Sequence, residues 1–226
     1  MVESGGFEAV LGYTFSDSGL LKQALTHRSA GAHNNERLEF LGDSVLGFLV
    51  AENLYARFAT ASEGQLSRVR SAIVKEDSLA RVARSMNLGQ HIRLGSGELK
   101  SGGFNRDSIL ADAVEAILGA VYLDGGPESA RRFVERHFQQ PLAGADPEKM
   151  KKDPKTRLQE HLQKQGLSLP AYIVDSISGA SHNQMFQVRC VVSAIDTEFP
   201  GQGSSKRKAE QAAAAAALAA IGGVEQ

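Results

Sequence analysis

The chain has 226 residues, 42% of them hydrophobic, which is enough for one or two domains with buried cores. It contains no run of about 18 apolar residues, so we expect no membrane span. Its net charge of −1 divides unevenly, with 16 basic and 19 acidic side chains in residues 1–150 against 9 and 7 in residues 151–226. This partial segregation suggests two units with different tasks.

The first residues and the cysteine content bear on the compartment. MVESGGFEAV lacks a basic segment followed by a long apolar one, so no secretory signal is predicted. Cys190 is the single cysteine and has no partner for an intramolecular disulfide. A reducing, cytoplasmic location is therefore expected.

The chain opens with two short predicted helices. Phe7–Leu11 has helical character and ends at Gly12. Asp17 or Ser18 can cap the next helix, in which leucines and alanines recur at helical spacing. His27 follows the end of that helix, and we interpret it as a helix-end or core histidine.

The next helix carries an acidic stripe. At 100° per residue, Glu36, Glu39 and Asp43 lie within about 60° of one another. A predicted buried stripe lies on the other side: Leu38, Leu41, Val45, Phe48 and Leu49. Phe40 is the apolar exception, because it falls among the acids. Like charges on one face repel, so a divalent cation would offset this arrangement.

The helix should continue to about Phe58, and Ser62 with Gln65 then reads as a capping box. Glu63 lies in the first turn of this next helix, where the helix dipole alone favours a carboxylate, so a structural and a site role both stay open. Asp77-Ser78 predicts the start of another helix and Gly89 its end.

Residues 91–106 are predicted to be an irregular, glycine-rich loop. A phosphate-binding P-loop requires glycine directly before Lys-Ser or Lys-Thr. Leu99 precedes Lys100-Ser101 here, so the sequence does not predict a nucleotide site of that kind.

Asp107–Leu123 forms the second acidic helix, with Asp112 and Glu115 opposite a stripe of aliphatic side chains. A glycine follows the last acid of each acidic helix by four residues: Gly47 and Gly119. We expect these glycines to leave space beside the carboxylates. The Asp-Gly-Gly-Pro segment at 124–127 breaks the chain before a last helix, and residues 1–138 show no strand pattern.

Residues 139–152 carry proline, glycine and charge without a periodic stripe and are predicted to be a linker. Residues 153–222 then form a second, smaller domain. Asp153-Pro154 starts a helix, and three strands follow in the order of the chain: 172–177, 185–192 and 195–199. A Gly-Gln-Gly-Ser-Ser loop leads into a final alanine-rich helix. The predicted fold is an all-α domain followed by an α+β domain with the order α-β-β-β-α.

The acids suggest metal chemistry. Carboxylate oxygens without a histidine or cysteine cluster suit Mg²⁺, with Mn²⁺ as a substitute, and not Zn²⁺. Such an ion commonly completes its shell with substrate phosphates, which indicates phosphodiester chemistry. Two alternatives are ordinary solvated helix faces and a glycosidase carboxylate pair. The repetition of acid pairs on two helices disfavours the first, and the absence of tryptophan for sugar stacking disfavours the second.

The second domain carries the predicted nucleic-acid contacts. Lys206, Arg207 and Lys208 stand at a helix N-terminus, where the backbone amides also favour phosphate. A solvated face is the plain alternative for this run. Three further polar side chains are candidates for contacts with 2′-hydroxyls or base edges: Gln159, Glu160 and His182.

These segments resemble the ribonuclease III family of double-strand-specific endoribonucleases. NERLEFLGDSVL at 35–46 and ELKSGGFNRDSILADAVEAILG at 98–119 are similar to its acidic segments. KTRLQEHLQ at 155–163, a Gly179-x-x-His182-x-x-x-Phe186 turn and GQGSSKRKAEQAAA at 201–214 are similar to its double-stranded-RNA-binding domain. The order of motifs is most similar to the compact bacterial form.

The resemblance implies an all-α nuclease domain in residues 1–138 that forms a homodimer. Glu39, Asp43, Asp112 and Glu115 would hold magnesium, and Asp43 and Glu115 would be the most rate-critical. Glu36 and Glu63 match outer acidic positions that shape the RNA valley. Phe40 matches an aromatic side chain that inserts into the partner subunit.

The implied activity is cleavage of double-stranded RNA to 5′-phosphate and 3′-hydroxyl ends with short 3′ overhangs, in rRNA and mRNA processing and decay. A non-cleaving regulator that binds double-stranded RNA is the alternative, and the full set of acids disfavours it. A DNA nuclease is a third possibility, disfavoured because the second domain resembles a reader of A-form geometry.

Overall fold

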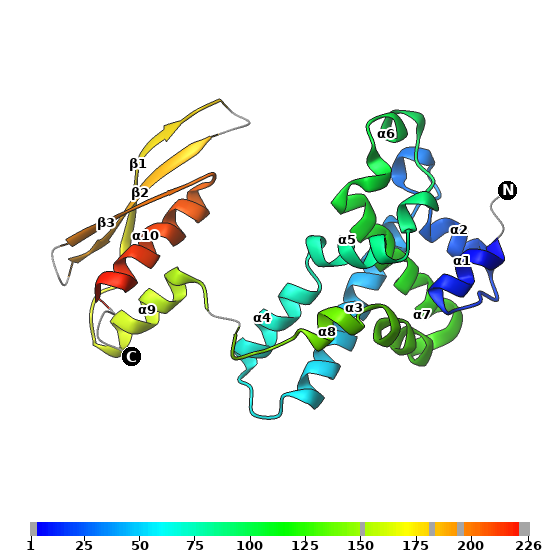
Figure 1. Cartoon of the computed structure of the whole chain (residues 1–226), viewed down its shortest axis with the longest axis horizontal. Coiled ribbons are helices and arrows are strands. Elements are labelled where there is room, and N and C mark those ends of the chain that lie inside the picture. The colour runs from blue at the N-terminus through cyan, green and yellow to red at the C-terminus, as the bar shows by residue number, and fades with distance from the viewer. Residues whose placement is uncertain (1–3, 150–151, 181–183, 194–196, 222–226) are drawn as a thin grey trace. The chain divides into compact units, whose positions relative to one another are not determined.

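The computed structural model describes residues 4–149, 152–180, 184–193 and 197–221 (Figure 1). The chain divides into two compact units, Met1–Met150 and Lys151–Gln226, which we call the N-terminal and C-terminal units. The first is helical and the second contains a three-stranded sheet, so the predicted fold class is confirmed. No helix in the described part of the chain is long and apolar enough to cross a membrane.

The N-terminal unit is built around two long helices, α3 and α7. Its helices and 3-10 turns are α1 (Ser4–Leu11), α2 (Ser18–Ala24), η1 (Arg28–Ala30), α3 (Glu36–Arg57), α4 (Glu63–Ile73), α5 (Glu76–Ser85), η2 (Leu88–Gln90), α6 (Ser96–Lys100), η3 (Gly103–Asn105), α7 (Asp107–His137) and α8 (Gln139–Ala143). Leu46 and Val50 of α3 and Val114 and Ile117 of α7 have no exposed surface. Their burial supplies much of the hydrophobic stabilisation of this unit.

Local signals predicted several helix ends correctly. Asp17 caps α2 by accepting a hydrogen bond from the Gly19 amide at 2.8 Å. Ser62 and Gln65 form the expected capping box at α4. Gly126, with φ 75° and ψ −177°, breaks the helical geometry within α7 immediately before Pro127, in the segment where the sequence predicts a break.

Two predictions for residues 86–106 were wrong. The helix α5 ends at Ser85, before the predicted stop at Gly89, and Asn87 beyond it takes the left-handed conformation. Gly89 instead lies in η2, where a β-carbon would overlap the carbonyl oxygen of Phe104. The predicted irregular loop contains α6 and η3, which are too short to produce a recognisable hydrophobic period.

The predicted linker at 139–152 also needs correction. Its first residues form α8, and Leu142 and Ala145 are buried in the core of the N-terminal unit. The guanidinium of Arg57 donates a hydrogen bond to the carbonyl oxygen of Leu142. One helical turn with one large apolar side chain has no period to detect, so the sequence pattern does not distinguish this segment from a linker.

The C-terminal unit has the predicted order of elements: α9 (Pro154–Lys164), β1 (Ala171–Ser178), β2 (Met185–Val192), β3 (Thr197–Gly203) and α10 (Lys206–Ile221). The sheet is antiparallel with the order β1-β2-β3. Leu158 and Leu162 of α9 share a core with Cys190 and Val192 of β2 and with the inner alanines of α10.

The third strand differs from its predicted range of 195–199. It runs from 197 to 203 and includes the glycines that were expected to form a loop, while Ile195 lies outside the described residues. A β-carbon on Gly201 would overlap the backbone of Ala209 and Ala213 in α10. Glycine in the strand and alanine in the helix therefore permit close packing of these two elements.

Candidate active site and nucleic-acid interface

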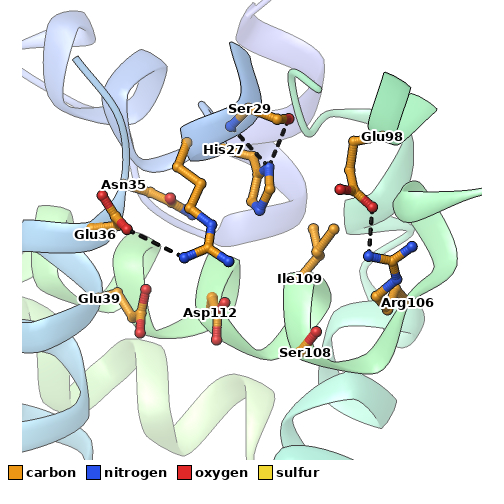
Figure 2. Close-up of a pocket in the computed structure, with 11 residues that line it drawn as sticks. His27, Ser29, Asn35, Glu36, Glu39, Glu98, Arg106, Ser108, Ile109 and Asp112 are labelled. Carbon is orange, nitrogen blue, oxygen red and sulfur yellow. Dashed lines mark hydrogen bonds and ion pairs between the residues drawn. The ribbon is translucent and has the colours of Figure 1, made fainter. Parts of the chain in front are cut away.

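A cavity of about 500 Å³ opens beside the N-terminal ends of α3 and α7 (Figure 2). Glu39 from α3 and Asp112 from α7, both predicted metal ligands, contribute to its wall. Glu36 lines it as well and forms an ion pair with Arg28 at 3.7 Å. The cavity therefore combines predicted site acids with basic side chains.

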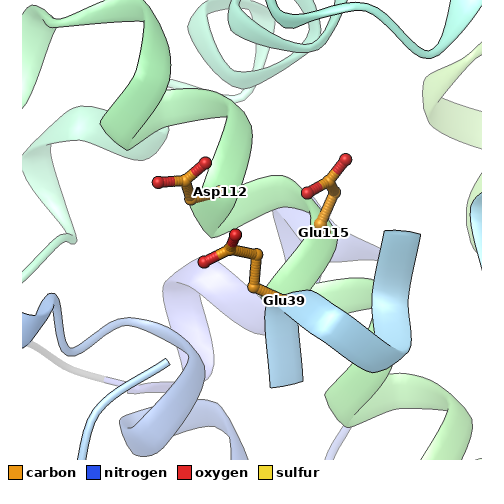
Figure 3. A group of neighbouring side chains, drawn as sticks. All are labelled: Glu39, Asp112 and Glu115. Carbon is orange, nitrogen blue, oxygen red and sulfur yellow. The ribbon is translucent and has the colours of Figure 1, made fainter. Parts of the chain in front are cut away.

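Three predicted metal ligands come together at the edge of this cavity (Figure 3). One carboxylate oxygen from each of Glu39, Asp112 and Glu115 lies within 4.8 Å of the other two. All three side chains are half-buried. We call these residues the acid cluster.

The acid cluster forms because α3 and α7 approach each other closely. A β-carbon on Gly42 would overlap the carbonyl oxygen of Glu115, and one on Gly119 would overlap that of Leu38. Backbone therefore contacts backbone where the helices cross, next to the acids. The prediction that Gly47 and Gly119 leave open space was wrong at Gly119, where helix backbone fills it. At Gly47 the space is open, because nothing lies within 4 Å of a β-carbon there.

Burial and mutual repulsion raise the pKa values of the acid cluster. Burial is the largest cause for Glu115, whose pKa is raised to about 8, followed by the charges of Asp43, Glu39 and Asp112. Burial also raises the pKa of Glu39 and of Asp112. In Asp112 the charge of His27 opposes this rise more strongly than any other charge. Burial and neighbouring negative charges disfavour the ionised form of these carboxylates, and a bound cation would favour it.

Asp43, the fourth predicted ligand, is not part of the group of three. It is exposed and lies one turn beyond Glu39 on α3. Its charge nevertheless affects the pKa of Glu115 more than any other charge does. The structure therefore places Asp43 close enough to act on the acid cluster electrostatically.

The two predicted outer acids differ in their surroundings. Glu36 accepts a hydrogen bond from the side chain of Asn34 at 3.2 Å and lines the cavity. Glu63 is exposed in the first turn of α4, where it accepts a hydrogen bond from Ser67 at 2.7 Å. Within this chain Glu63 lies outside the acid cluster, so a role in an RNA valley stays a prediction.

Basic and hydroxyl side chains of the cavity were missed as site residues. Arg28, Arg106 and Ser108 line it, and so does His27, which had been interpreted as a core or helix-end residue. His27 is indeed buried, with 8% of its surface exposed, yet it also faces the cavity. No sequence pattern marks these residues, because the fold, and not the period of one helix, brings them to the acids.

Aromatic side chains on α3 are exposed in this single chain. Phe40 is 77% exposed, Phe48 61% and Tyr55 77%. The placement of Phe48 in the buried stripe was therefore wrong for the chain alone. An exposed row of large aromatic residues is typical of a protein-interaction surface.

Five of the six predicted RNA-binding residues of the C-terminal unit lie on its two helices. Lys206, Arg207 and Lys208 are exposed and begin α10. Gln159 is exposed on α9, whereas Glu160 accepts a hydrogen bond from Lys152 at 2.6 Å. His182 lies outside the described residues.

The two units match two separate family models. Residues 17–142 match the model described as Ribonuclease-III-like. Residues 154–221 match the double-stranded RNA binding motif. The boundary between the two matches falls close to the division into compact units.

Curated relatives extend over nearly the whole chain. It is 57% identical to Ribonuclease 3 of Methylococcus capsulatus over 204 residues, which cover 90% of this chain and 89% of that protein. It is 55% identical to Ribonuclease 3 of Vibrio cholerae over 208 residues, 92% of each chain. Both units are therefore present in these relatives.

Solved structures match the N-terminal unit. The nuclease domain of ribonuclease III from Campylobacter jejuni is 44% identical, with a TM-score of 0.61 over 65% of this chain and 100% of that one. Another structure of this domain, 47% identical with a TM-score of 0.57 over 59% of this chain and 96% of that one, is described as showing structural flexibility in a region involved in dimer formation. By its sequence, its paired units and its nuclease fold, this chain belongs to the ribonuclease III family of endoribonucleases.

Proposed function

We propose that the protein is a Mg²⁺-dependent endonuclease that cleaves double-stranded RNA to 5′-phosphate and 3′-hydroxyl ends with short 3′ overhangs. The observation that carries this proposal is the acid cluster, in which two helices place three carboxylates within 4.8 Å of one another. The same chain matches the double-stranded RNA binding motif.

The residues present fit a hard divalent cation. Glu39, Asp112 and Glu115 offer oxygen donors, which Mg²⁺ and Mn²⁺ prefer, and their raised pKa values indicate that a positive charge would relieve repulsion. A bound cation would supply Lewis-acid stabilisation of the reacting phosphodiester and would lower the pKa of a water molecule. Two members of the acid cluster, Glu39 and Asp112, line the cavity, which leaves room for substrate oxygens.

The side chains themselves would have separate tasks. Glu39, Asp112 and Glu115 would hold the cation, and Glu115 must lose its proton before it can do so. Asp43 adds negative charge and would complete the ligand set once RNA is bound. We expect Asp43 and Glu115 to be the most rate-critical residues.

The C-terminal unit would supply most of the affinity for the duplex. Lys206, Arg207 and Lys208 would contact phosphates, while Gln159 and Glu160, with His182, would contact the minor groove. A reader of this type recognises A-form shape over about 16 base pairs and not a sequence. This division of tasks agrees with the exposed basic side chains of the C-terminal unit and the half-buried carboxylates of the N-terminal unit.

A cleavage assay with mapped ends tests the proposal. Purified protein with Mg²⁺ should cut long duplex RNA and leave duplex DNA intact. Glu115→Gln should lower the single-turnover rate by at least about a hundredfold, because it removes one charged ligand of the cation. Binding without cleavage by the parent protein would support the non-cleaving regulator instead, and equal cutting of DNA would support a DNA nuclease.

We also propose that the enzyme is a homodimer in which Phe40 enters the partner subunit. The exposed aromatic row on α3 supports this, since Phe40, Phe48 and Tyr55 would otherwise remain in water. Phe40→Ala should weaken the dimer by about tenfold or more, because a buried aromatic anchor commonly contributes over 1.4 kcal/mol. Sedimentation across a dilution series measures this, and an unchanged dissociation constant would count against the role. Action on rRNA and mRNA in the cytoplasm remains a prediction.

A further inference from the structure

His27 is held in one orientation by its neighbour Ser29. The Ser29 backbone N–H donates to His27 Nδ1 at 3.2 Å, and the Ser29 hydroxyl lies 2.8 Å from the same nitrogen. A backbone N–H can only donate, so Nδ1 is an acceptor. The proton of the neutral ring is therefore on Nε2.

Nε2 has no hydrogen-bond partner among the described residues, although only 8% of the surface of His27 is exposed. The ring lines the cavity that Glu39 and Asp112 also line, and Figure 2 shows its free edge directed into that cavity. Nε2 is not fully buried, so water can accept its hydrogen bond in the free protein. This donor is useful if the cavity holds an acceptor in the working state.

The backbone around His27 is fixed by contacts that do not involve the ring. The His27 amide donates to the Arg93 carbonyl at 3.0 Å, and the Gly95 amide donates to the Ser29 hydroxyl at 2.9 Å. A β-carbon on Gly95 would overlap the carbonyl oxygen of Ser29, so the two segments touch. These contacts already join the segments, which leaves the Nε2 side of the ring without a structural task.

We propose that His27 is a positioning residue of the cation site, donating a hydrogen bond from Nε2 to the Asp112 carboxylate directly or through one water. This inference rests on the proposed metal-dependent function. A carboxylate with one oxygen occupied by a donor presents the other oxygen to the cation in a fixed direction. His27 would act through Asp112, without touching the RNA.

Two substitutions separate the two nitrogens. His27→Asn keeps a polar atom near the position of Nδ1, facing Ser29, and loses the Nε2 donor. His27→Gln reaches further and restores an N–H near the position of Nε2. His33→Asn is the matched control, because His33 is an exposed histidine outside the cavity lining.

The first measurement is Mn²⁺ binding to the full-length protein without RNA, followed by electron paramagnetic resonance, with a thermal melt of each variant. We expect His27→Asn to weaken Mn²⁺ binding by about tenfold or more, the effect usual for a lost partner of a metal ligand. His27→Gln should stay within about threefold of the parent, and His33→Asn should be unchanged. The Mg²⁺ concentration needed for half-maximal cleavage should follow the same order.

Mn²⁺ binding by His27→Asn as tight as that of the parent would overturn the inference and leave the proposed function intact. Equal losses in the Asn and Gln variants, in step with lowered melting temperatures, would assign His27 a structural role only. A parent protein that binds no Mn²⁺ would overturn the proposed metal dependence and this inference together.

Discussion

The two units hold their functional charges in opposite ways. The acid cluster of the N-terminal unit is half-buried, and its members lie within 4.8 Å of one another. The basic residues of the C-terminal unit are exposed at the start of α10. The first arrangement depends on the position of the backbone and on protonation, whereas the second depends mainly on the ions in solution.

Both units also use glycine to bring backbones together, with different consequences. Gly42 and Gly119 lie at the crossing of α3 and α7, directly beside the acid cluster. Gly201 and Gly203 lie where β3 meets the first turns of α10, against Ala209 and the backbone of Lys208. The exposed basic residues do not have to converge on one point, whereas the acid cluster does. A shift of the backbone should therefore disturb the site in the N-terminal unit more than in the C-terminal unit.

The largest expected effect is at Gly42. In Gly42→Ala the new β-carbon would overlap the carbonyl oxygen of Glu115, so α3 and α7 must move apart. Overpacking of this kind typically costs about 1–3 kcal/mol of stability, and displacement of the acids should lower cleavage by at least about a hundredfold. Thermal melts and single-turnover cleavage measure the two effects separately.

Gly47→Ala is the matched control for this change. It lies on the same helix, and nothing is within 4 Å of its built β-carbon. Because alanine favours a helix over glycine, the control should be as stable as the parent or slightly more stable. Near-parental cleavage by Gly42→Ala would show that the helix crossing does not position the acids.

The same contrast explains what the sequence could reveal about the site. The helical period placed Glu36, Glu39 and Asp43 on one face and Asp112 and Glu115 on another, because each helix must present its acids opposite a buried stripe. Only the family resemblance separated Glu39 from Glu36. The period could not identify Gly42 as the contact point or place His27 beside Asp112, since both depend on how separate elements pack. Likewise, Gly201 was read as a loop residue because its partner in α10 is distant along the chain.

An intermediate effect is expected from removing exposed charge in the C-terminal unit. Replacing Lys206 and Lys208 with alanine should weaken duplex RNA binding by about tenfold at moderate salt, because two phosphate contacts and their released counterions are lost. The slope of log affinity against log salt should become shallower by about 1–2. Binding titrations at several salt concentrations measure both quantities.

An exposed basic residue elsewhere in the C-terminal unit provides the control for the substitutions of Lys206 and Lys208. Lys164 stands near the end of α9, is exposed and lies outside the predicted contacts, so Lys164→Ala should change the slope little. An unchanged slope in the double variant would exclude phosphate contact by the start of α10. If removing Lys206 and Lys208 strongly changed how RNA binding depends on pH, the contrast between the two units would fail.

The smallest expected effect is a change in stability with pH at Glu115, measured without metal. Its pKa is about 8 in the folded protein, above the ordinary value of 4.5 that it regains on unfolding. Between these values the folded state binds the proton more tightly, so stability falls as the pH rises from about 4.5 to about 8. Glu115→Gln has no such proton and should therefore melt higher than the parent at pH 8.5.

The melting temperatures of Glu115→Gln and the parent should differ by about 2–4 °C at pH 8.5 and by close to zero near pH 4.5. The difference is modest because the carboxylate is partly exposed and therefore screened. Glu135→Gln, an exposed site on the same helix, should show no such dependence. Adding Mn²⁺ should then raise the melting temperature of the parent more than that of Glu115→Gln, since binding to the folded state stabilises it. If the parent and Glu115→Gln differed in melting temperature by the same amount at both pH values, burial would not control the pKa of this carboxylate. The acid cluster would then resemble the exposed charges of α10, and the contrast between the units would fail at its most buried residue.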